Sequence, residues 1–129
     1  LAGEVDFFSI GTNDLVQYTL AVDRGNANIS YLYNHFNPAV LRLVQRTITS
    51  ARENGIWAGM CGEMASDPNA AVLLMAMGIN ELSMSAPSIP RVKEKIRSIS
   101  SVKAKEILAD VMTMEDGDDI RNYLQKILG

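Results

Sequence analysis

One order of elements recurs three times along this chain: a strand-like segment, then a polar loop, then a helix-like segment. The strand-like segments are expected near Val5–Ile10, Ile56–Met60 and Glu81–Met84. The first is apolar at nearly every position, which is typical of a parallel strand that is covered on both faces. Strands that alternate with helices in this way predict an α/β fold with a parallel sheet.

Helical periodicity follows each expected strand. Helices are expected over residues 15–22, 37–55, 69–77 and 88–99, with a short helical turn at 29–33. The 69–77 helix is apolar nearly all round and should therefore be buried. Asn13 or Asp14 is expected to cap the first helix, because a short side-chain oxygen accepts a bond from a free backbone N–H. Gly55 is well placed to end the second helix in a left-handed conformation, and Gly78 to end the third.

The tail of the chain predicts two further amphipathic helices. Their apolar faces are formed by Ala104, Ile107, Leu108 and Val111 in one, and by Ile120, Tyr123, Leu124 and Ile127 in the other. An eight-unit parallel barrel needs about 250 residues, and this chain has 129. Three strand–helix units cannot close such a barrel. The pattern predicts either three-eighths of a barrel with a helical tail or a small open sheet.

Composition excludes several classes of protein. A net charge of −3 gives no electrostatic reason to expect nucleic acid as a partner. No apolar run approaches the roughly 20 residues that cross a bilayer, and Leu1–Asp6 lacks the basic start and apolar stretch of a signal peptide. The single cysteine, Cys61, excludes an internal disulfide framework and fits a reducing, cytoplasmic setting.

Small, polar and reactive residues gather in the loops that follow the expected strands. These loops are Gly11–Asp14, Cys61–Asp67 and Ser83–Pro87, whereas the loops at the opposite strand ends are plain turns. In parallel α/β folds, functional groups lie at the carboxyl ends of the strands. The asymmetry therefore indicates a site at this edge of the sheet.

The first of these loops offers an amide beside a carboxylate. Asp14 can bind Mg²⁺, which takes oxygen ligands and usually bridges to substrate phosphates, and Asn13 can hold a phosphate or carboxylate oxygen. Both residue types are also common in turns and caps, so spacing alone leaves the two interpretations open. Arg24 lies in the next loop and can grip a phosphate with its planar fork, or it is a solvated surface charge.

The second loop begins with the only thiol of the chain. Cys61 directly follows a strand and can donate a proton or act as a nucleophile, or it is buried and inert. Glu63 either orients this loop or is a surface carboxylate. His35, the only histidine, precedes a helix far in sequence from the strand ends and is interpreted as structural or surface rather than catalytic.

Two long segments, Asp6–Leu15 and Gly59–Ala65, resemble signature segments of the phosphoenolpyruvate-utilising enzymes. This family includes Enzyme I of the bacterial sugar phosphotransferase system, pyruvate phosphate dikinase and phosphoenolpyruvate synthase. Tyr31–Tyr33, Phe36–Arg42 and the form of the cysteine loop resemble the Enzyme I branch more than the dikinases. The resemblance runs from about residue 5 to 99 and continues more loosely into the tail.

The resemblance implies a (β/α)8 barrel, with its last three units in residues 1–100 and a C-terminal helical tail in 101–129. It also implies roles at matching positions. Asn13 resembles an asparagine that contacts phosphoenolpyruvate, and Asp14 resembles one of two acidic Mg²⁺ ligands. Arg24 resembles an arginine that holds the phosphoryl group. Cys61 resembles the acid/base that protonates C3 of the enolate as pyruvate forms.

The implied reaction moves a phosphoryl group from phosphoenolpyruvate to a histidine on a separate N-terminal domain, and then to the carrier protein HPr. That domain, the second Mg²⁺ carboxylate and further substrate arginines are not in this chain, so the chain alone is expected not to turn over. The resemblance also implies a homodimer in the full-length enzyme. Alternatives are a fragment of a dikinase or synthase, or a non-catalytic dimerisation module.

Overall fold

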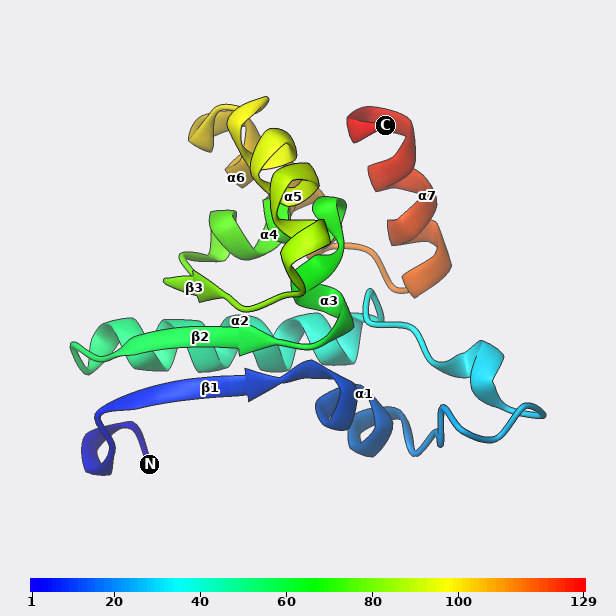
Figure 1. Ribbon diagram of the computed structural model, residues 1–129, viewed down its shortest axis with the longest axis horizontal. Helices are drawn as coiled ribbons and strands as arrows, with labels where there is room; N and C mark the ends of the chain where they lie inside the picture. Colours follow the sequence, from blue (N-terminus) through cyan, green and yellow to red (C-terminus); the bar gives the residue numbers. More distant parts are fainter.

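A computed structural model describes residues 1–129 as a mixed α/β structure built on a three-stranded parallel sheet (Figure 1). The strands are β1 (Phe7–Gly11), β2 (Trp57–Cys61) and β3 (Glu81–Leu82), in the order β1-β2-β3. The predicted parallel sheet is confirmed, although β1 starts two residues later than predicted, β2 is shifted by one, and β3 is shorter. Register fixes the strand ends, because Gly11 lies opposite Cys61 and Met60 opposite Leu82.

Each predicted helix is present. The helices are α1 (Thr12–Leu20), α2 (Pro38–Glu53), α3 (Glu63–Ser66), α4 (Pro68–Met77), α5 (Ile89–Arg97), α6 (Ser101–Val111) and α7 (Gly117–Leu128), with 3-10 turns at Ala2–Glu4, Ser30–Leu32 and Ala86–Ser88. Only α3 was not predicted, since its four residues lie in what the sequence pattern treats as a loop. No helix has the length and apolar character that a membrane span requires.

Helix ends follow the expected chemistry at most positions. Asn37, Asp67 and Asp116 cap α2, α4 and α7 by accepting bonds from backbone N–H groups of the first turn. Gly55 (φ +70°) and Gly78 (φ +95°) adopt the positive φ predicted after α2 and α4.

The prediction that Asn13 or Asp14 caps α1 is wrong. Helix α1 begins at Thr12, directly after the last residue of β1, and Gly11 occupies the cap position without a side-chain bond. Asn13 and Asp14 therefore lie inside the first turn of α1. Their side chains are free of the capping role and are available to other parts of the molecule.

The sheet is covered on one face only. Helix α2 packs along β1 and β2 (Figure 1) and meets the buried side chains of Ile10, Ala58 and Met60. On the opposite face, Phe7 is 48% and Trp57 41% exposed, and their rings stack with centroids 4.7 Å apart. The expectation that β1 is covered on both faces is wrong for this chain, because its helices supply cover on one side.

The hydrophobic core lies between α2, α4 and the tail helices. Helix α4 is buried nearly all round, as predicted, and contacts both α5 and α6. The apolar face predicted for α6 is fully buried, whereas in α7 Ile120 and Leu124 are buried and Ile127 is 42% exposed. Each fully buried Leu or Ile side chain contributes about 1.5–3 kcal/mol to folding. This packing fixes α3 and α4, and with them the loop after β2.

Candidate active site

The carboxyl ends of β1 and β2 are tied together at one edge of the sheet. Thr12 is the one buried polar residue of the chain, and its Oγ1 donates to the carbonyl oxygen of Cys61 at 2.9 Å. Gly62 adopts φ +101°, and a Cβ there would collide with the Thr12 hydroxyl and approach Asn13 Oδ1 to 3.0 Å. Only glycine allows so close an approach in this conformation. The first and second predicted loops are therefore neighbours, as the parallel sheet implied.

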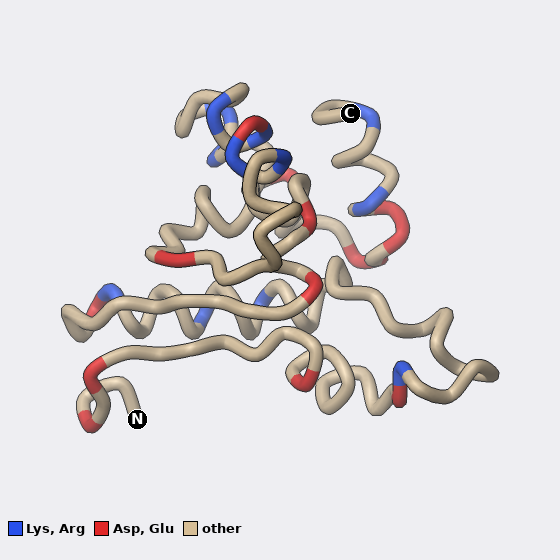
Figure 2. Tube along the Cα trace, in the orientation of Figure 1, with Lys and Arg blue, Asp and Glu red and all other residues tan.

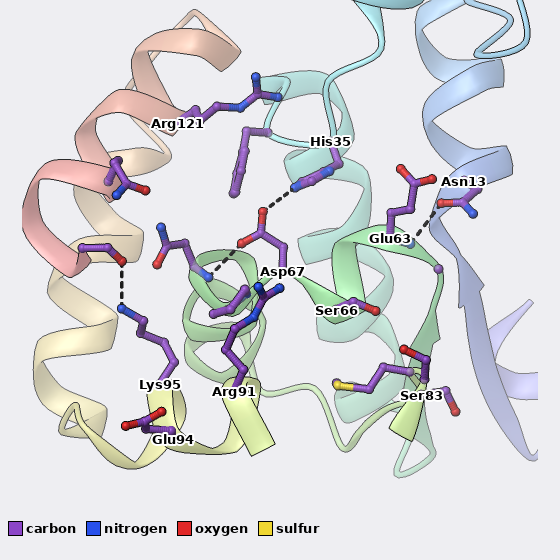
Figure 3. A pocket seen from close by; sticks show the side chains of 18 of the residues that line it. Asn13, His35, Glu63, Ser66, Asp67, Ser83, Arg91, Glu94, Lys95 and Arg121 are labelled. Atoms are coloured by element: carbon purple, nitrogen blue, oxygen red, sulfur yellow. Dashed lines mark hydrogen bonds and ion pairs between the residues drawn. The ribbon is translucent and has the colours of Figure 1, made fainter. Parts of the chain in front are cut away.

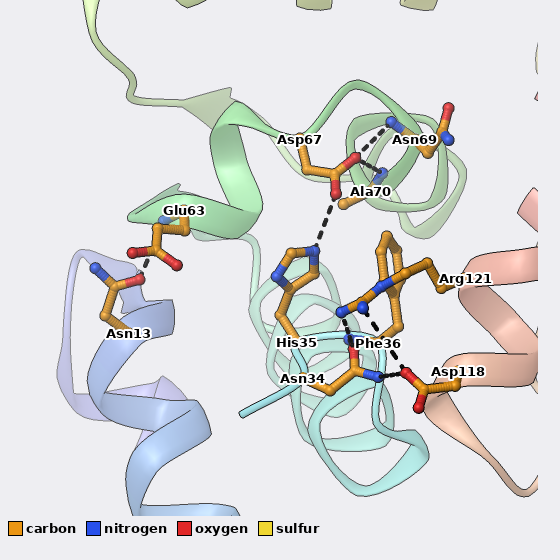
Figure 4. A network of polar contacts seen from close by, with 10 residues as sticks. All are labelled: Asn13, Asn34, His35, Phe36, Glu63, Asp67, Asn69, Ala70, Asp118 and Arg121. Carbon is orange, nitrogen blue, oxygen red and sulfur yellow. Dashed lines mark hydrogen bonds and ion pairs between the residues drawn. The ribbon is translucent and has the colours of Figure 1, made fainter. Parts of the chain in front are cut away.

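Asn13 connects three segments of this edge. Its Oδ1 accepts the backbone N–H of Glu63 at 3.1 Å (Figure 4) and the hydroxyl of Tyr33 at 3.3 Å. A backbone N–H can only donate, so the amide atom that faces Glu63 must be the oxygen. Asn13 Nδ2 is thereby left as a donor, which suits a phosphate or carboxylate oxygen of a ligand.

Arg24 returns from its loop to the same edge. Its Nη1 lies 3.2 Å from Glu63 Oε1, and its backbone N–H donates to Gln17 Oε1 at 3.0 Å. Both side chains of the ion pair are about half exposed, so the pair contributes little to stability. Such a pair can be exchanged at low cost, which leaves the guanidinium available to an anionic ligand.

Tyr33 was not predicted as part of the site. Burial raises the pKa of its phenol, and the carboxylates of Glu63 and Asp14 raise the pKa further, against the opposing charge of Arg24. These three charged groups therefore lie around the phenol, which stays protonated and donates at neutral pH. The contact with Asn13 spans 20 residues, so no local pattern in the sequence indicates it.

Asp14 is exposed in the first turn of α1 and makes no side-chain hydrogen bond or ion pair. Mg²⁺ sites in enzymes usually use one or two carboxylates together with substrate phosphates. Nowhere does the chain bring together three His, Cys, Asp or Glu side chains that could hold a metal. Asp14 could therefore supply one carboxylate oxygen to such an ion.

Cys61 is an exposed, free thiol at the end of β2. Alternation along the strand puts it on the side of the sheet that also carries Trp57, opposite the buried Met60. The alternative that this cysteine is buried is therefore wrong. The hydrogen bond from Thr12 to the Cys61 carbonyl oxygen holds Cys61 beside the first turn of α1, which contains Asn13.

A cavity of about 1070 Å³ opens beside this edge, between the loop after β2 and helices α5 and α7 (Figure 3). Asn13 and Glu63 line it, whereas Asp14, Arg24 and Cys61 do not. Basic residues are spread along α5 and α6, and acidic residues gather at the start of α7 (Figure 2). The cavity wall itself carries charges of both signs, because its lining includes Glu63, Asp67 and Glu94 as well as Arg91, Lys95 and Arg121.

His35 lines the same cavity and makes a structural contact, in line with its interpretation from sequence. Its Nε2 lies 3.1 Å from Asp67 Oδ2, while Asp67 Oδ1 caps α4 through the N–H groups of Asn69 and Ala70 (Figure 4). Burial alone would raise the pKa of Asp67, but the bonds from His35 and from the two N–H groups outweigh it and lower the pKa below its ordinary value.

Residues 1–101 match the family model described as "PEP-utilising enzyme, PEP-binding domain". The chain belongs to the PEP-utilising enzymes. The resemblance inferred from the segments around Asn13 and Cys61 is thus confirmed.

Several similar proteins carry the same name. The chain is 52% identical to the phosphoenolpyruvate-protein phosphotransferase of Buchnera aphidicola subsp. Acyrthosiphon pisum over 128 residues. This alignment covers 99% of this chain and 22% of that protein. It is 58% identical over 110 residues to the protein of that name from Haemophilus influenzae, covering 85% of this chain and 19% of that protein. The chain therefore spans about a fifth of the length of the curated relatives it matches.

Proposed function

We propose that this chain is the part of a phosphoenolpyruvate-protein phosphotransferase, Enzyme I, that supplies one side of the phosphoenolpyruvate site. The observation that carries the proposal is the junction of Asn13, Arg24 and Glu63 at the edge where β1 and β2 end. That junction occurs in a chain of the PEP-binding family. The names of the relatives favour Enzyme I over a dikinase or synthase.

In this proposal residues 1–100 are the last three units of a (β/α)8 barrel and residues 101–129 are a helical tail. Two features support it. The face of the sheet that bears Phe7 and Trp57 is uncovered, as expected if it lines the inside of a barrel whose other strands lie outside this chain. The outer edges of β1 and β3 also lack partner strands, and a closed barrel leaves no such edges.

Substrate binding is assigned to an amide and a guanidinium. Asn13 Nδ2 donates to an oxygen of phosphoenolpyruvate, since its Oδ1 is already occupied. Arg24 leaves Glu63 and holds the phosphoryl group bidentately. Positioning and charge stabilisation are most of what phosphoryl transfer requires.

Asp14 is proposed as the one Mg²⁺ ligand of this chain, with the second carboxylate on a strand outside it. When bound, the ion would supply positive charge that offsets the charge of the phosphoryl oxygens. The Asp14 carboxylate is exposed in the first turn of α1 and has no hydrogen-bond or ion-pair partner in this chain that a metal ion would have to displace.

Cys61 is proposed as the acid that completes the reaction. The bond between the bridging oxygen and phosphorus breaks as the phosphoryl group passes to a histidine nitrogen on another domain, and an enolate remains. C3 of that enolate takes the proton of the thiol, which yields pyruvate and a thiolate. The phosphohistidine then transfers its phosphoryl group to HPr. In this proposal the chain serves sugar uptake in the cytoplasm as part of a homodimeric enzyme.

A binding experiment on the full-length protein tests the proposal. Arg24→Ala should weaken binding of phosphoenolpyruvate at least about tenfold, since a hydrogen bond to a charged group is worth about 1.5–3 kcal/mol. Arg42→Ala, an exposed arginine on the polar side of α2, is the matched control and should bind normally. Equal binding by both variants, measured by calorimetry, would refute the assignment of the site.

A different class of function, a non-catalytic dimerisation module, makes the opposite prediction. It expects no phosphoenolpyruvate binding that depends on Asn13 or Arg24, and a change in the dimer when the uncovered face at Trp57 is altered. Sedimentation of a Trp57→Ala protein, set beside the calorimetry of Arg24→Ala, separates the two possibilities.

A further inference from the structure

The segment that leads into α2 touches three parts of the molecule in succession. Tyr33 contacts Asn13 of α1. Asn34 donates to Asp118 of α7 at 3.0 Å, and His35 contacts Asp67 ahead of α4 (Figure 4). The contacts of His35 and Asn34 join structural elements. The contact of Tyr33 differs, because its partner Asn13 is the side chain that is proposed to bind phosphoenolpyruvate.

Two donors meet at a single acceptor atom. Asn13 Oδ1 receives the N–H of Glu63 and the hydroxyl of Tyr33, at 3.1 and 3.3 Å. The N–H of Glu63 decides which end of the amide is the oxygen, but one bond still allows the amide plane to turn about it. A second donor on the same oxygen fixes that plane, and an amide oxygen carries no hydrogen, so Tyr33 must be the donor.

We propose that Tyr33 is a positioning residue that fixes the amide plane of Asn13 and so aims Asn13 Nδ2 at an anionic oxygen of the substrate. The inference rests on the proposed function, because it requires that Asn13 contact phosphoenolpyruvate. It adds a residue that touches no substrate and acts through another side chain. Locking a ligand-binding group by a supporting hydrogen bond lowers the entropy lost on binding.

A second route for Tyr33, through Arg24, is separable from the first by experiment. The charge of Arg24 acts on the Tyr33 phenol. In this second route, the Tyr33 hydroxyl would act by holding the loop that carries Arg24. Arg24 has anchors of its own, however, in Gln17 and Glu63. Action through Asn13 predicts coupling between Tyr33 and Asn13, and additive effects of Tyr33 and Arg24.

Removing one hydroxyl tests the proposal in the full-length protein. Tyr33→Phe should raise KM for phosphoenolpyruvate about 2- to 10-fold, the range for one neutral hydrogen bond, and change kcat less than about twofold. Tyr31→Phe makes the same change two residues away on a side chain that is 78% exposed, and it should behave as wild type. An unchanged KM in Tyr33→Phe would overturn the inference.

A double-mutant cycle identifies the route. If Tyr33 acts through Asn13, the pair Tyr33→Phe with Asn13→Ala should have the KM of Asn13→Ala alone. Effects that multiply in this pair would overturn the inference, and so would coupling to Arg24→Ala in place of Asn13→Ala. An Asn13→Ala protein with normal KM would instead refute the proposed function.

A measurement on the unaltered protein covers the case in which Tyr33→Phe fails to fold. The side-chain NH₂ resonances of Asn13 should shift when phosphoenolpyruvate is added, because Nδ2 is the atom that faces the ligand. Resonances that stay unchanged while the ligand is bound would overturn the aiming of Nδ2 and with it the role of Tyr33.

Discussion

Asn13 accepts the backbone N–H of Glu63 at 3.1 Å, across 50 residues of sequence. This bond joins the first turn of α1 to the first residue of α3, so the ends of β1 and β2 share one polar surface. The same bond satisfies an N–H at the start of α3, where helices leave donors without intrahelical partners. The oxygen of Asn13 thus serves the fold, and its nitrogen remains for a ligand.

Asn13→Asp separates these two roles. The carboxylate keeps an acceptor for Glu63 and Tyr33, so the protein should fold, but it replaces the Nδ2 donor with a negative oxygen. We expect binding of phosphoenolpyruvate to fall about 10- to 100-fold or more, since a donor to a charged group is lost and repulsion is added. Calorimetry on the full-length protein measures this. Asn122→Asp, on the exposed side of α7, is the control; binding by Asn13→Asp that matches it would contradict the role of Nδ2.

Cys61 should affect turnover and leave binding intact. Cys61→Ala removes the proposed proton donor, and general acid catalysis contributes about 10²- to 10⁴-fold. Pyruvate formation by the full-length protein should fall by that range, whereas the Kd for phosphoenolpyruvate should change less than about threefold. Alkylation of Cys61, the one cysteine of this chain, should reproduce the loss of turnover in wild type. Alkylation of the Cys61→Ala protein, followed by the same binding measurement, is the control for effects at any other cysteine of the full-length protein. Full activity in Cys61→Ala would exclude the thiol as the acid.

The close approach at Gly62 should make it the most sensitive glycine of the site. Gly62→Ala places a Cβ against Thr12 and Asn13 at φ +101°, and a strained backbone position of this kind costs about 1–3 kcal/mol. Gly11→Ala is the matched control, because a Cβ there meets nothing within 4 Å and should change stability by less than about 0.5 kcal/mol. Chemical denaturation of both variants gives the comparison, and equal stabilities would contradict the tight packing of the two strand ends.

Local patterns in the sequence predicted what local interactions determine. The apolar positions Leu41, Val44 and Ile48 recur at helical spacing, and all are buried on one face of α2. Residues after Pro68 are apolar on every side, and α4 is buried accordingly. In both helices the pattern that drives burial lies within one segment, so the sequence alone was sufficient.

Non-local contacts explain what the sequence did not predict. The end of β1 at Gly11 is set by pairing with Cys61, 50 residues away, so α1 starts at Thr12 and Asn13 is not its cap. Tyr33 likewise belongs to the site only because the chain folds back onto Asn13. The exposure of Trp57 depends on whether a helix of the chain covers its face of the sheet. The periodicity of a strand does not reveal this.

Acid should weaken the start of α4 through Asp67. The pKa of Asp67 lies below its ordinary value, so the folded state favours the carboxylate. The resulting stabilisation is present above the ordinary aspartate pKa of about 3.9 and is lost as the pH falls through the lowered pKa. Asp67→Asn keeps a good cap for α4 but carries no charge that titrates.

Urea denaturation of wild type and Asp67→Asn between about pH 6 and pH 2.5 checks this prediction. Wild type should be more stable near pH 5 to 6, by at most about 2 kcal/mol, the size of one hydrogen bond to a charged group. The difference should shrink towards zero at the acid end, because a protonated Asp67 no longer favours the bond with His35. Asp6→Asn, an exposed carboxylate outside this network, should follow the wild-type profile. A difference between wild type and Asp67→Asn that stays constant with pH would show that the charge of Asp67 does not stabilise the fold.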